Sequence, residues 1–147
     1  MTARRPTFAT PEDLEQHFYT AIARHDIEAL MACWAEDEEV VCIHPTGQQL
    51  VGHQAIRAGW LAVFTATHFQ IATTPVSQWQ GMMVSTHHQL EMLLVGDEQT
   101  PHGPLQVTHT FVRNAHGWRL VCRHASANAS DDEAESVTIQ SQQHTLH

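Results

Sequence analysis

The stretch of sequence that decides the fold runs over residues 18–64 and reads FYTAIARHDIEALMACWAEDEEVVCIHPTGQQLVGHQAIRAGWLAVF. Near its start, Asp26 is placed to cap a short helix, because its carboxylate can accept hydrogen bonds from the free N–H groups of a helix start. The apolar run 40–44 then predicts a short buried strand, which Pro45 and Gly47 end with a turn. A helical pattern resumes after this turn. The stretch therefore predicts a helix, a strand and a further helix in close succession.

The sequence on both sides of this stretch extends the pattern. Upstream, Thr10 and Pro11 are typical of a helix start, and apolar residues recur at helical spacing after them. Downstream the period changes to two, which predicts strands over 69–80, 82–95, 105–114 and 117–126. Helices followed by a run of antiparallel strands indicate an α+β fold, with the helices packed on one face of a sheet.

The length of 147 residues fits a single domain. We assign residues 1–127 to this domain and expect residues 128–147, which are acidic and then rich in Ser and Gln, to form a polar, mobile tail. The apolar runs are far shorter than the ~20 residues that a membrane span needs. No apolar stretch follows the two N-terminal arginines, so a secretory signal is not expected. The predicted location is the cytoplasm.

Charge and cysteine content narrow the possible functions further. The formal net charge is −9, and only seven residues are Lys or Arg. Since a nucleic-acid-binding protein normally carries a basic patch, we expect no nucleic-acid partner and no membrane partner. The three cysteines, Cys33, Cys42 and Cys122, are odd in number and lie in apolar stretches without a CxxC pair. They are expected to be buried free thiols rather than disulfides or zinc ligands.

Thirteen histidines are the unusual feature of the composition. Because successive side chains of a strand point to opposite faces, the strand patterns predict that His109, His124 and His88 lie among core-facing residues. His44 ends the first strand, where its side chain can reach the mouth of a cavity. A single histidine on an apolar face is usually a hydrogen-bonded core residue. Several on one face favour a polar, partly hydrated pocket, because each buried imidazole needs partners.

The motifs of residues 18–64 resemble those of SnoaL-like proteins of the nuclear transport factor 2-like superfamily. The shared pattern comprises the run Asp26–Leu30, Trp34 with Asp37, the turn His44-Pro45-Thr46-Gly47, and Gly52 with Ile56. The resemblance covers roughly residues 10–127. It implies a cystatin-like α+β cone, in which three N-terminal helices pack on a strongly curved antiparallel sheet and enclose an internal pocket. It also implies a homodimer formed through the outer face of the sheet, to which strand alternation assigns Arg119 and Arg123.

Ketosteroid isomerase is a distant relative within this superfamily. The resemblance matches His44 to its general-base aspartate, His109 to its oxyanion-side aspartic acid and Phe18 to its oxyanion tyrosine. Because Phe18 has no hydroxyl to donate to a dienolate oxygen, the isomerase mechanism is not carried over. The resemblance implies where the pocket lies and leaves its chemistry open.

Two functions remain open at this point. In the first, the chain is a cofactor-independent isomerase, dehydratase or cyclase, with His44 as general base and His109 as acid or oxyanion donor. In the second, it is a non-catalytic module that binds a small apolar or aromatic molecule or forms a dimer. The residues expected to bind the ligand are Phe18, Trp34, Trp60, His88, Phe111, Cys122 and His124.

A metal site is a third hypothesis. It would use the imidazoles of His44, His88, His109 and His124 as ligands. No HxH or HExxH spacing supports it, so we expect neither a metal nor a cofactor.

Overall fold

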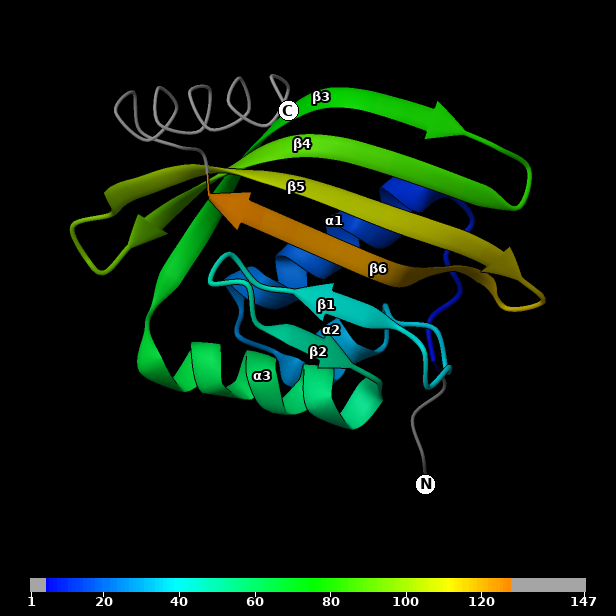
Figure 1. Cartoon of the computed structure of the whole chain (residues 1–147), viewed down its shortest axis with the longest axis horizontal. Coiled ribbons are helices and arrows are strands. Elements are labelled where there is room, and N and C mark those ends of the chain that lie inside the picture. The colour runs from blue at the N-terminus through cyan, green and yellow to red at the C-terminus, as the bar shows by residue number, and fades with distance from the viewer. Residues whose placement is uncertain (1–4, 128–147) are drawn as a thin grey trace, which may run out of the picture.

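The computed structural model describes residues 5–127, which form three helices and six strands (Figure 1). In chain order the elements are α1 (Pro11–Ala23), α2 (Ile27–Met31), β1 (Val41–Ile43), β2 (Gln49–Val51), α3 (His53–Ala66), β3 (Phe69–Gln80), β4 (Val84–Val95), β5 (Thr100–Asn114) and β6 (Gly117–Ala127). The predicted α+β class is confirmed, although only α1 and α3 are long helices. The tail predicted over 128–147 lies outside the described residues.

The first two helices begin where the capping signals predict. The Thr10 hydroxyl accepts a hydrogen bond from the backbone N–H of Asp13 at 3.1 Å. The Asp26 carboxylate accepts one from the backbone N–H of Ala29, also at 3.1 Å. Each bond satisfies a donor that has no partner within its helix. The apolar stripe of α1 is buried against the sheet.

The six strands form one sheet in the order β2-β1-β6-β5-β4-β3. Neighbouring strands are antiparallel except for β1 and β6, which run parallel with Val41 opposite Cys122. The prediction of a wholly antiparallel sheet is wrong at this pair. Sequence reasoning also missed β2, because its three residues are too few to show a recognisable alternation.

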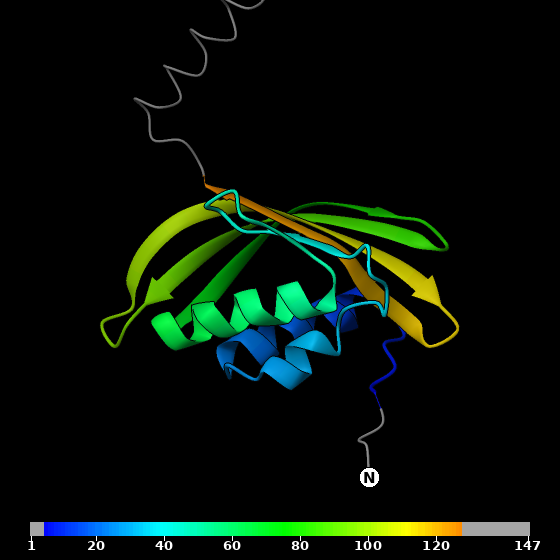
Figure 2. The ribbon, with the colours of Figure 1, turned by 60° about the horizontal axis from the view of Figure 1, so that its bottom comes forward.

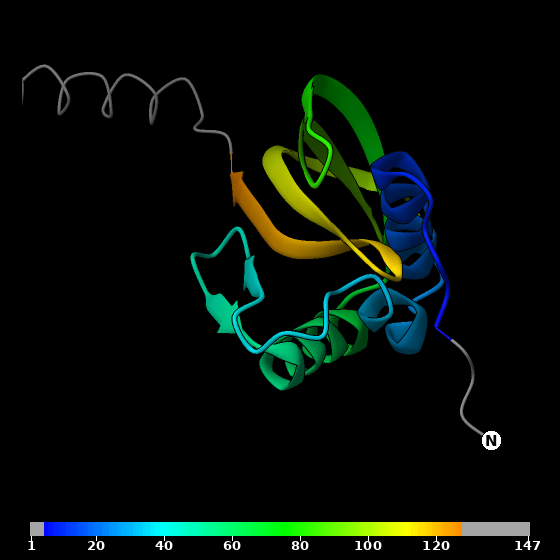
Figure 3. The same cartoon turned by 90° about the vertical axis from the view of Figure 1, so that its right-hand side faces the viewer.

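The helices all lie on one side of the sheet, which curves around them (Figure 2, Figure 3). The apolar core fills the space between the two layers. Its largest fully buried side chains are Trp34, Phe18, Phe111, Leu14, Ile22, Leu30, Ile56 and Leu120. None of the helices in the described range combines the length and the apolar character needed to cross a bilayer.

Strand β4 presents to the helices the face opposite to the one predicted. Its buried residues are Ser85, His87, Gln89 and Glu91. His88 lies on the outer face, where it is hydrogen-bonded to Gln106 of β5. The prediction that His88 faces the core is therefore wrong. The sequence pattern predicts that the more apolar face of β4 is the inner one. In the structure, the inner face carries the side chains of a polar network beneath α1.

Strand β6 changes faces at a β-bulge. Thr110 of β5 pairs with Cys122 and the next residue, Phe111, pairs with Leu120, so that Val121 is an extra residue in β6. Beyond the bulge, Arg123 and Ala125 point inward and are buried, whereas His124 is exposed. The prediction of an inward His124 and an outward Arg123 is wrong, because strict alternation assumes that no residue is inserted.

Arg119 pairs with Val112, next to the inward-facing pair of Phe111 and Leu120, so it lies on the outer side of β6, but it is buried there rather than exposed to solvent. The chain segment that precedes α1 covers it. The Arg119 guanidinium donates a hydrogen bond to the carbonyl oxygen of Pro6 at 2.6 Å and lies 5.2 Å from the centre of the Phe8 ring. Phe8 and Gly117 form an isolated parallel bridge beside this contact.

Candidate ligand site

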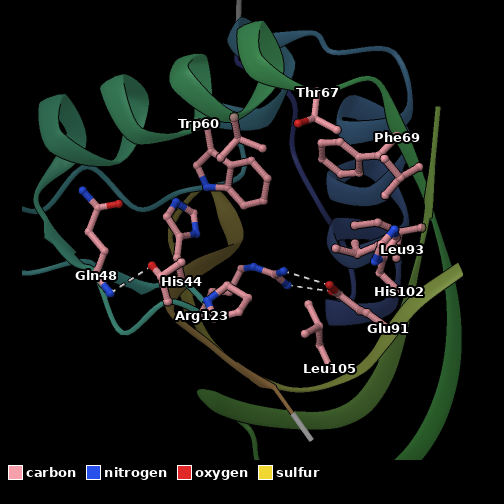
Figure 4. A pocket seen from close by; sticks show the side chains of 15 residues that line it. His44, Gln48, Trp60, Thr67, Phe69, Glu91, Leu93, His102, Leu105 and Arg123 are labelled. Atoms are coloured by element: carbon pink, nitrogen blue, oxygen red, sulfur yellow. Dashed lines mark hydrogen bonds and ion pairs between the residues drawn. The ribbon is translucent and has the colours of Figure 1, made fainter. Parts of the chain in front are cut away.

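A cavity of about 530 Å³ lies between the sheet and α3 (Figure 4). Most of its surface is apolar, and the apolar side chains that line it include Val63, Phe69, Ile71, Leu93, Val95 and Leu105. The polar groups of His44, Glu91 and Arg123 also face it. A concave, largely apolar site with a few placed polar groups is the usual form of a small-molecule pocket.

His44 lies at the end of β1, where the turn before β2 places its side chain in the cavity wall. Only 8% of the residue is exposed, and its ring meets Trp60 of α3 edge-on at 5.3 Å between centroids. Its Nε2 atom is buried and has no hydrogen-bond partner within residues 5–127. Burial, and next the charge of Arg123, lower the pKa of His44, so its imidazole is neutral at pH 7.

Arg123 and Glu91 form a buried, bidentate ion pair in the cavity wall. The two guanidinium nitrogens lie 2.7 and 2.9 Å from the two carboxylate oxygens (Figure 4). Burial alone would raise the pKa of Glu91, but the charge and hydrogen bonds of Arg123, with a bond from Tyr19, hold it below its ordinary value. Arg123 also lies over the faces of Phe18 and Trp60. This wall is therefore rigid and close to neutral in charge.

Behind the ion pair, a hydrogen-bonded chain runs from the sheet to α1. The Nε2 atom of His109 lies 3.0 Å from the Arg123 guanidinium, and its Nδ1 atom lies 2.8 Å from the Glu15 carboxylate. Because arginine is always a donor, Nε2 accepts and Nδ1 carries the proton, which makes His109 a neutral imidazole. Burial, opposed by the bond to Glu15, accordingly lowers the pKa of His109.

Glu15 of α1 also forms a hydrogen bond with a second imidazole, since the Nδ1 atom of His87 lies 3.0 Å from the other oxygen of its carboxylate. Burial would raise the pKa of Glu15, but the bonds from His109 and His87 outweigh it and lower the pKa to about 2. Two histidines of the sheet therefore hold one ionised carboxylate of the helix.

The structure brings only part of the predicted site together. His44 and Trp60 line the cavity, as predicted. His109 is buried behind Arg123 and does not line the cavity, so it does not face His44 across a common space. Phe18, Trp34 and Phe111 lie in the apolar core beside the cavity rather than in its wall.

The remaining predicted ligand residues lie elsewhere. His88 and His124 point away from the helices, and Cys122 is opposite Thr110 on the same outer side of the bulge. The four histidines of the metal hypothesis therefore do not converge. Over residues 5–127, no three His, Cys, Asp or Glu side chains are grouped so that they could hold a metal ion.

Sequence reasoning missed Glu91 and Arg123, which line the cavity, and Glu15, which lies behind them. A signal for two of them was present, because Glu91 and Arg123 are charged residues in the middle of strands. Such residues are rarely fully buried unless they are paired. The pairing itself depends on the bulge in β6, which the sequence pattern does not reveal.

Comparison with known proteins gives one family match and several structural relatives. A family model described as a SnoaL-like domain matches residues 12–130. A solved structure from Thiobacillus denitrificans, named as a candidate calcium/calmodulin-dependent protein kinase type II association domain, is 36% identical with a TM-score of 0.80. The match covers 84% of this chain and 99% of that one.

Two more distant relatives complete this comparison. A candidate dehydratase of the NTF2-like family from Streptomyces avermitilis has a TM-score of 0.72 at 23% identity, over 80% of this chain and 92% of that one. That similarity shows the fold alone. The F-box protein SKIP8 of Arabidopsis thaliana is 25% identical over 119 residues, which are 79% of this chain and 48% of that protein. This chain thus spans about half the length of that curated relative.

Proposed function

The chain belongs to the family of SnoaL-like domains, and from this premise we propose that it binds a small, largely apolar molecule in the cavity beside His44. The observation that carries the proposal is the form of the cavity: its volume is about 530 Å³, and its lining is mainly apolar with a few polar side chains that include His44, Arg123 and Glu91. This volume suits a molecule of one to three rings or a comparable chain.

The charges in the wall favour an uncharged ligand. The guanidinium of Arg123 is already neutralised by Glu91, and the His44 imidazole is neutral. An anion would enter an apolar cavity without a free cation to balance it, at a desolvation cost. The Nε2 atom of His44 has no hydrogen-bond partner within residues 5–127, so a ligand that reaches it through a small shift of the ring would gain one hydrogen bond from a hydroxyl or carbonyl group. An aromatic alcohol or ketone has this chemistry.

The ligand proposal predicts a selective effect of His44→Ala. A panel of uncharged phenols and aryl ketones is screened by the rise in melting temperature of the protein. We expect compounds that stabilise the wild type to bind His44→Ala about fivefold to tenfold more weakly, because one buried hydrogen bond and a ring contact are lost. His124→Ala, which removes an exposed histidine from the outer face, is the matched control and should bind normally. Equal loss in both variants, or no binder for the wild type, would contradict the proposal.

A second candidate function, proton transfer by His44, is favoured by the state of its imidazole. A neutral ring in the cavity wall, whose Nε2 atom has no hydrogen-bond partner within residues 5–127, has the protonation state that a general base needs. Because His109 does not reach the cavity, the same imidazole would have to remove a proton and return it. Isomerisation and dehydration are reactions that one such group can carry out, and the Streptomyces avermitilis relative is named as a candidate dehydratase.

Proton transfer by His44 predicts a particular pH dependence. We expect the His44 ring to titrate below 6.5, the ordinary value for histidine, in an NMR titration of the intact protein. Since the base must be neutral, the rate on any substrate should be constant near pH 7 and fall as the pH drops through this lowered pKa. A His44 titration at or above 6.5 would remove the basis for this candidate function.

We further propose that the chain forms a homodimer through the outer face of the sheet. The relative from Thiobacillus denitrificans is named as an association domain. Trp79, Met82, Met83 and Val84, near the turn between β3 and β4, are 63%, 85%, 57% and 40% exposed. Trp79 lies opposite Thr86, which alternates with the buried Ser85 and His87, so the indole is on the outer face. An exposed apolar patch of this kind is typical of an association surface.

Sedimentation of the wild type and of Trp79→Glu tests this proposal. The wild type is expected to sediment as a dimer and Trp79→Glu as a monomer, because a charge in the centre of an apolar interface is left unpaired. Leu61→Glu places the same charge at an exposed apolar residue of α3 and should remain dimeric. A monomeric wild type at tens of micromolar would show that the proposal is wrong.

A further inference from the structure

We propose that a second site, between the segment preceding α1 and the turn joining β5 to β6, binds a small oxyanion such as inorganic phosphate. The site is a polar hollow of about 350 Å³ on the far side of the core from the cavity beside His44. It is lined by Arg5, Thr7, Glu36, Asn114, His116 and Arg119. Figure 2 shows the two chain segments side by side, and the bridge between Phe8 and Gly117 joins them.

The principal evidence for the site is that Arg119 is buried without an ion-pair partner among the described residues. Only 2% of the residue is exposed, yet within residues 5–127 no carboxylate lies within salt-bridge distance of its guanidinium. Its hydrogen bonds run to two backbone carbonyl oxygens, those of Trp118 at 2.8 Å and Pro6 at 2.6 Å. Two bonds leave the rest of the five guanidinium donors free to bind an anion. A buried cation without a counter-ion is costly, and an anion in the hollow would offset this cost.

Arg5 adds a second positive charge on the same hollow. Its guanidinium is fixed by hydrogen bonds to the carbonyl oxygens of Ala32 and Trp34, at 3.1 and 2.7 Å. The charge of Arg5, after burial, is a cause of the lowered pKa of Arg119, so the two cations are close enough to repel one another. Glu36 pairs with Arg5 at 2.6 Å, but its side chain is 74% exposed. Two arginines thus share one exposed carboxylate, and the hollow keeps a net positive charge.

The turn between β5 and β6 supplies uncharged donors to the same place. The Asn114 side-chain oxygen accepts a hydrogen bond from the backbone N–H of His116 at 2.8 Å. This bond orients the amide so that its NH2 group remains available. The imidazole of His116 lines the hollow beside it. Guanidinium, amide and imidazole donors around a net positive hollow match the oxygens of a phosphate.

A phosphate titration of the intact protein, followed by NMR, tests the site. Sodium phosphate is added at constant ionic strength against sodium chloride. We expect saturable shifts at the backbone amides of His116 and Gly117 and at the side-chain N–H of Arg119, with no saturable shift in chloride. The shifts should not reach Trp60 or His44, so the result is independent of the ligand proposed for that cavity.

Variants of two exposed glutamates and of the half-buried Arg5 locate the site. Glu36→Gln removes the competing carboxylate and is expected to tighten phosphate binding roughly fivefold. Glu98→Gln, an exposed residue in the turn at the other end of β5, makes the same charge change and should leave the affinity unchanged. Arg5→Gln should weaken binding at least fivefold. The proposal is overturned if phosphate gives no saturable shifts, or if Glu36→Gln and Glu98→Gln have equal effects.

Discussion

Replacing Arg123 with methionine is expected to lower the free energy of unfolding by about 3–5 kcal/mol, measured by urea denaturation at pH 7. The variant leaves Glu91, which is fully buried, without its bidentate partner. An unpaired carboxylate in this position must either stay charged in an apolar setting or take up a proton. The lost stacking of the guanidinium on Phe18 and Trp60 adds to the effect.

A double-mutant cycle separates the buried charge from the lost packing. Combining Arg123→Met with Glu91→Gln removes both charges, and we expect the double variant to be more stable than Arg123→Met alone. Arg113→Met makes the same substitution at an exposed position of β5 and should change stability by less than about 0.5 kcal/mol. If Arg123→Met lowered the free energy of unfolding no more than Arg113→Met, the ion pair would not contribute to the stability of the fold.

Glu15→Gln is the second substitution with a large expected effect. Glu15 is the ionised carboxylate that joins α1 to two sheet histidines, and its pKa is lowered from 4.5 to about 2. The ionised form therefore stabilises the fold at every pH above 4.5, and this contribution is lost as the pH falls from 4.5 towards 2. The shift corresponds to about 2–3 kcal/mol at neutral pH, after allowance for partial contact with water. We expect Glu15→Gln to lose that amount at pH 7.

The pH dependence of stability distinguishes this account from a simple loss of packing. The lowered pKa of His109 acts in the same direction, because the unfolded chain takes up a proton below 6.5 while the buried imidazole stays neutral. Wild-type stability should thus decline from pH 6.5 downward and fall further below 4.5. Glu15→Gln should flatten the part below 4.5, whereas Asp13→Asn, an exposed carboxylate on the same helix, should not. Part of the decline should remain in Glu15→Gln, because the pKa of Glu91 is also lowered. A decline below pH 4.5 as steep in Glu15→Gln as in the wild type would contradict the assignment.

Much of the fold could be predicted from local signals. Thr10 and Asp26 form the caps that their positions predict, and the change from helical to twofold periodicity after Phe69 marks the start of the long strands. Two features without a local signal could not be predicted. The three-residue strand β2 is one, and the parallel pairing of β1 with β6 is the other, since it joins residues far apart in sequence.

The site was less predictable than the fold. The faces of the strands were predicted on the rule that the more apolar face packs against the core, and the polar residues of the site do not follow this rule. On β4 the inner face carries Ser85, His87, Gln89 and Glu91, and the outer face is the more apolar one. Hydrophobic alternation therefore selects the wrong face wherever a buried polar network replaces an apolar core. His44 does lie in the cavity wall, because its place depends on a strand end and the following turn rather than on alternation.

The bulge at Val121 decides which residues of strand β6 face the core. Each residue after the bulge points to the side opposite to the one that it would take if the same sequence formed a strand without a bulge. The inward position of Arg123 therefore depends on the extra residue that precedes it. Deletion of Val121 would remove the bulge and leave Arg123 opposite His109, with its side chain still inward. If the same sequence paired without the bulge, the two faces of the rest of the strand would be exchanged, which would bring Cys122 or His124 against Glu91 and carry the guanidinium outward. The residues that face the interior of this protein therefore depend on one unpaired residue that is not itself part of the site.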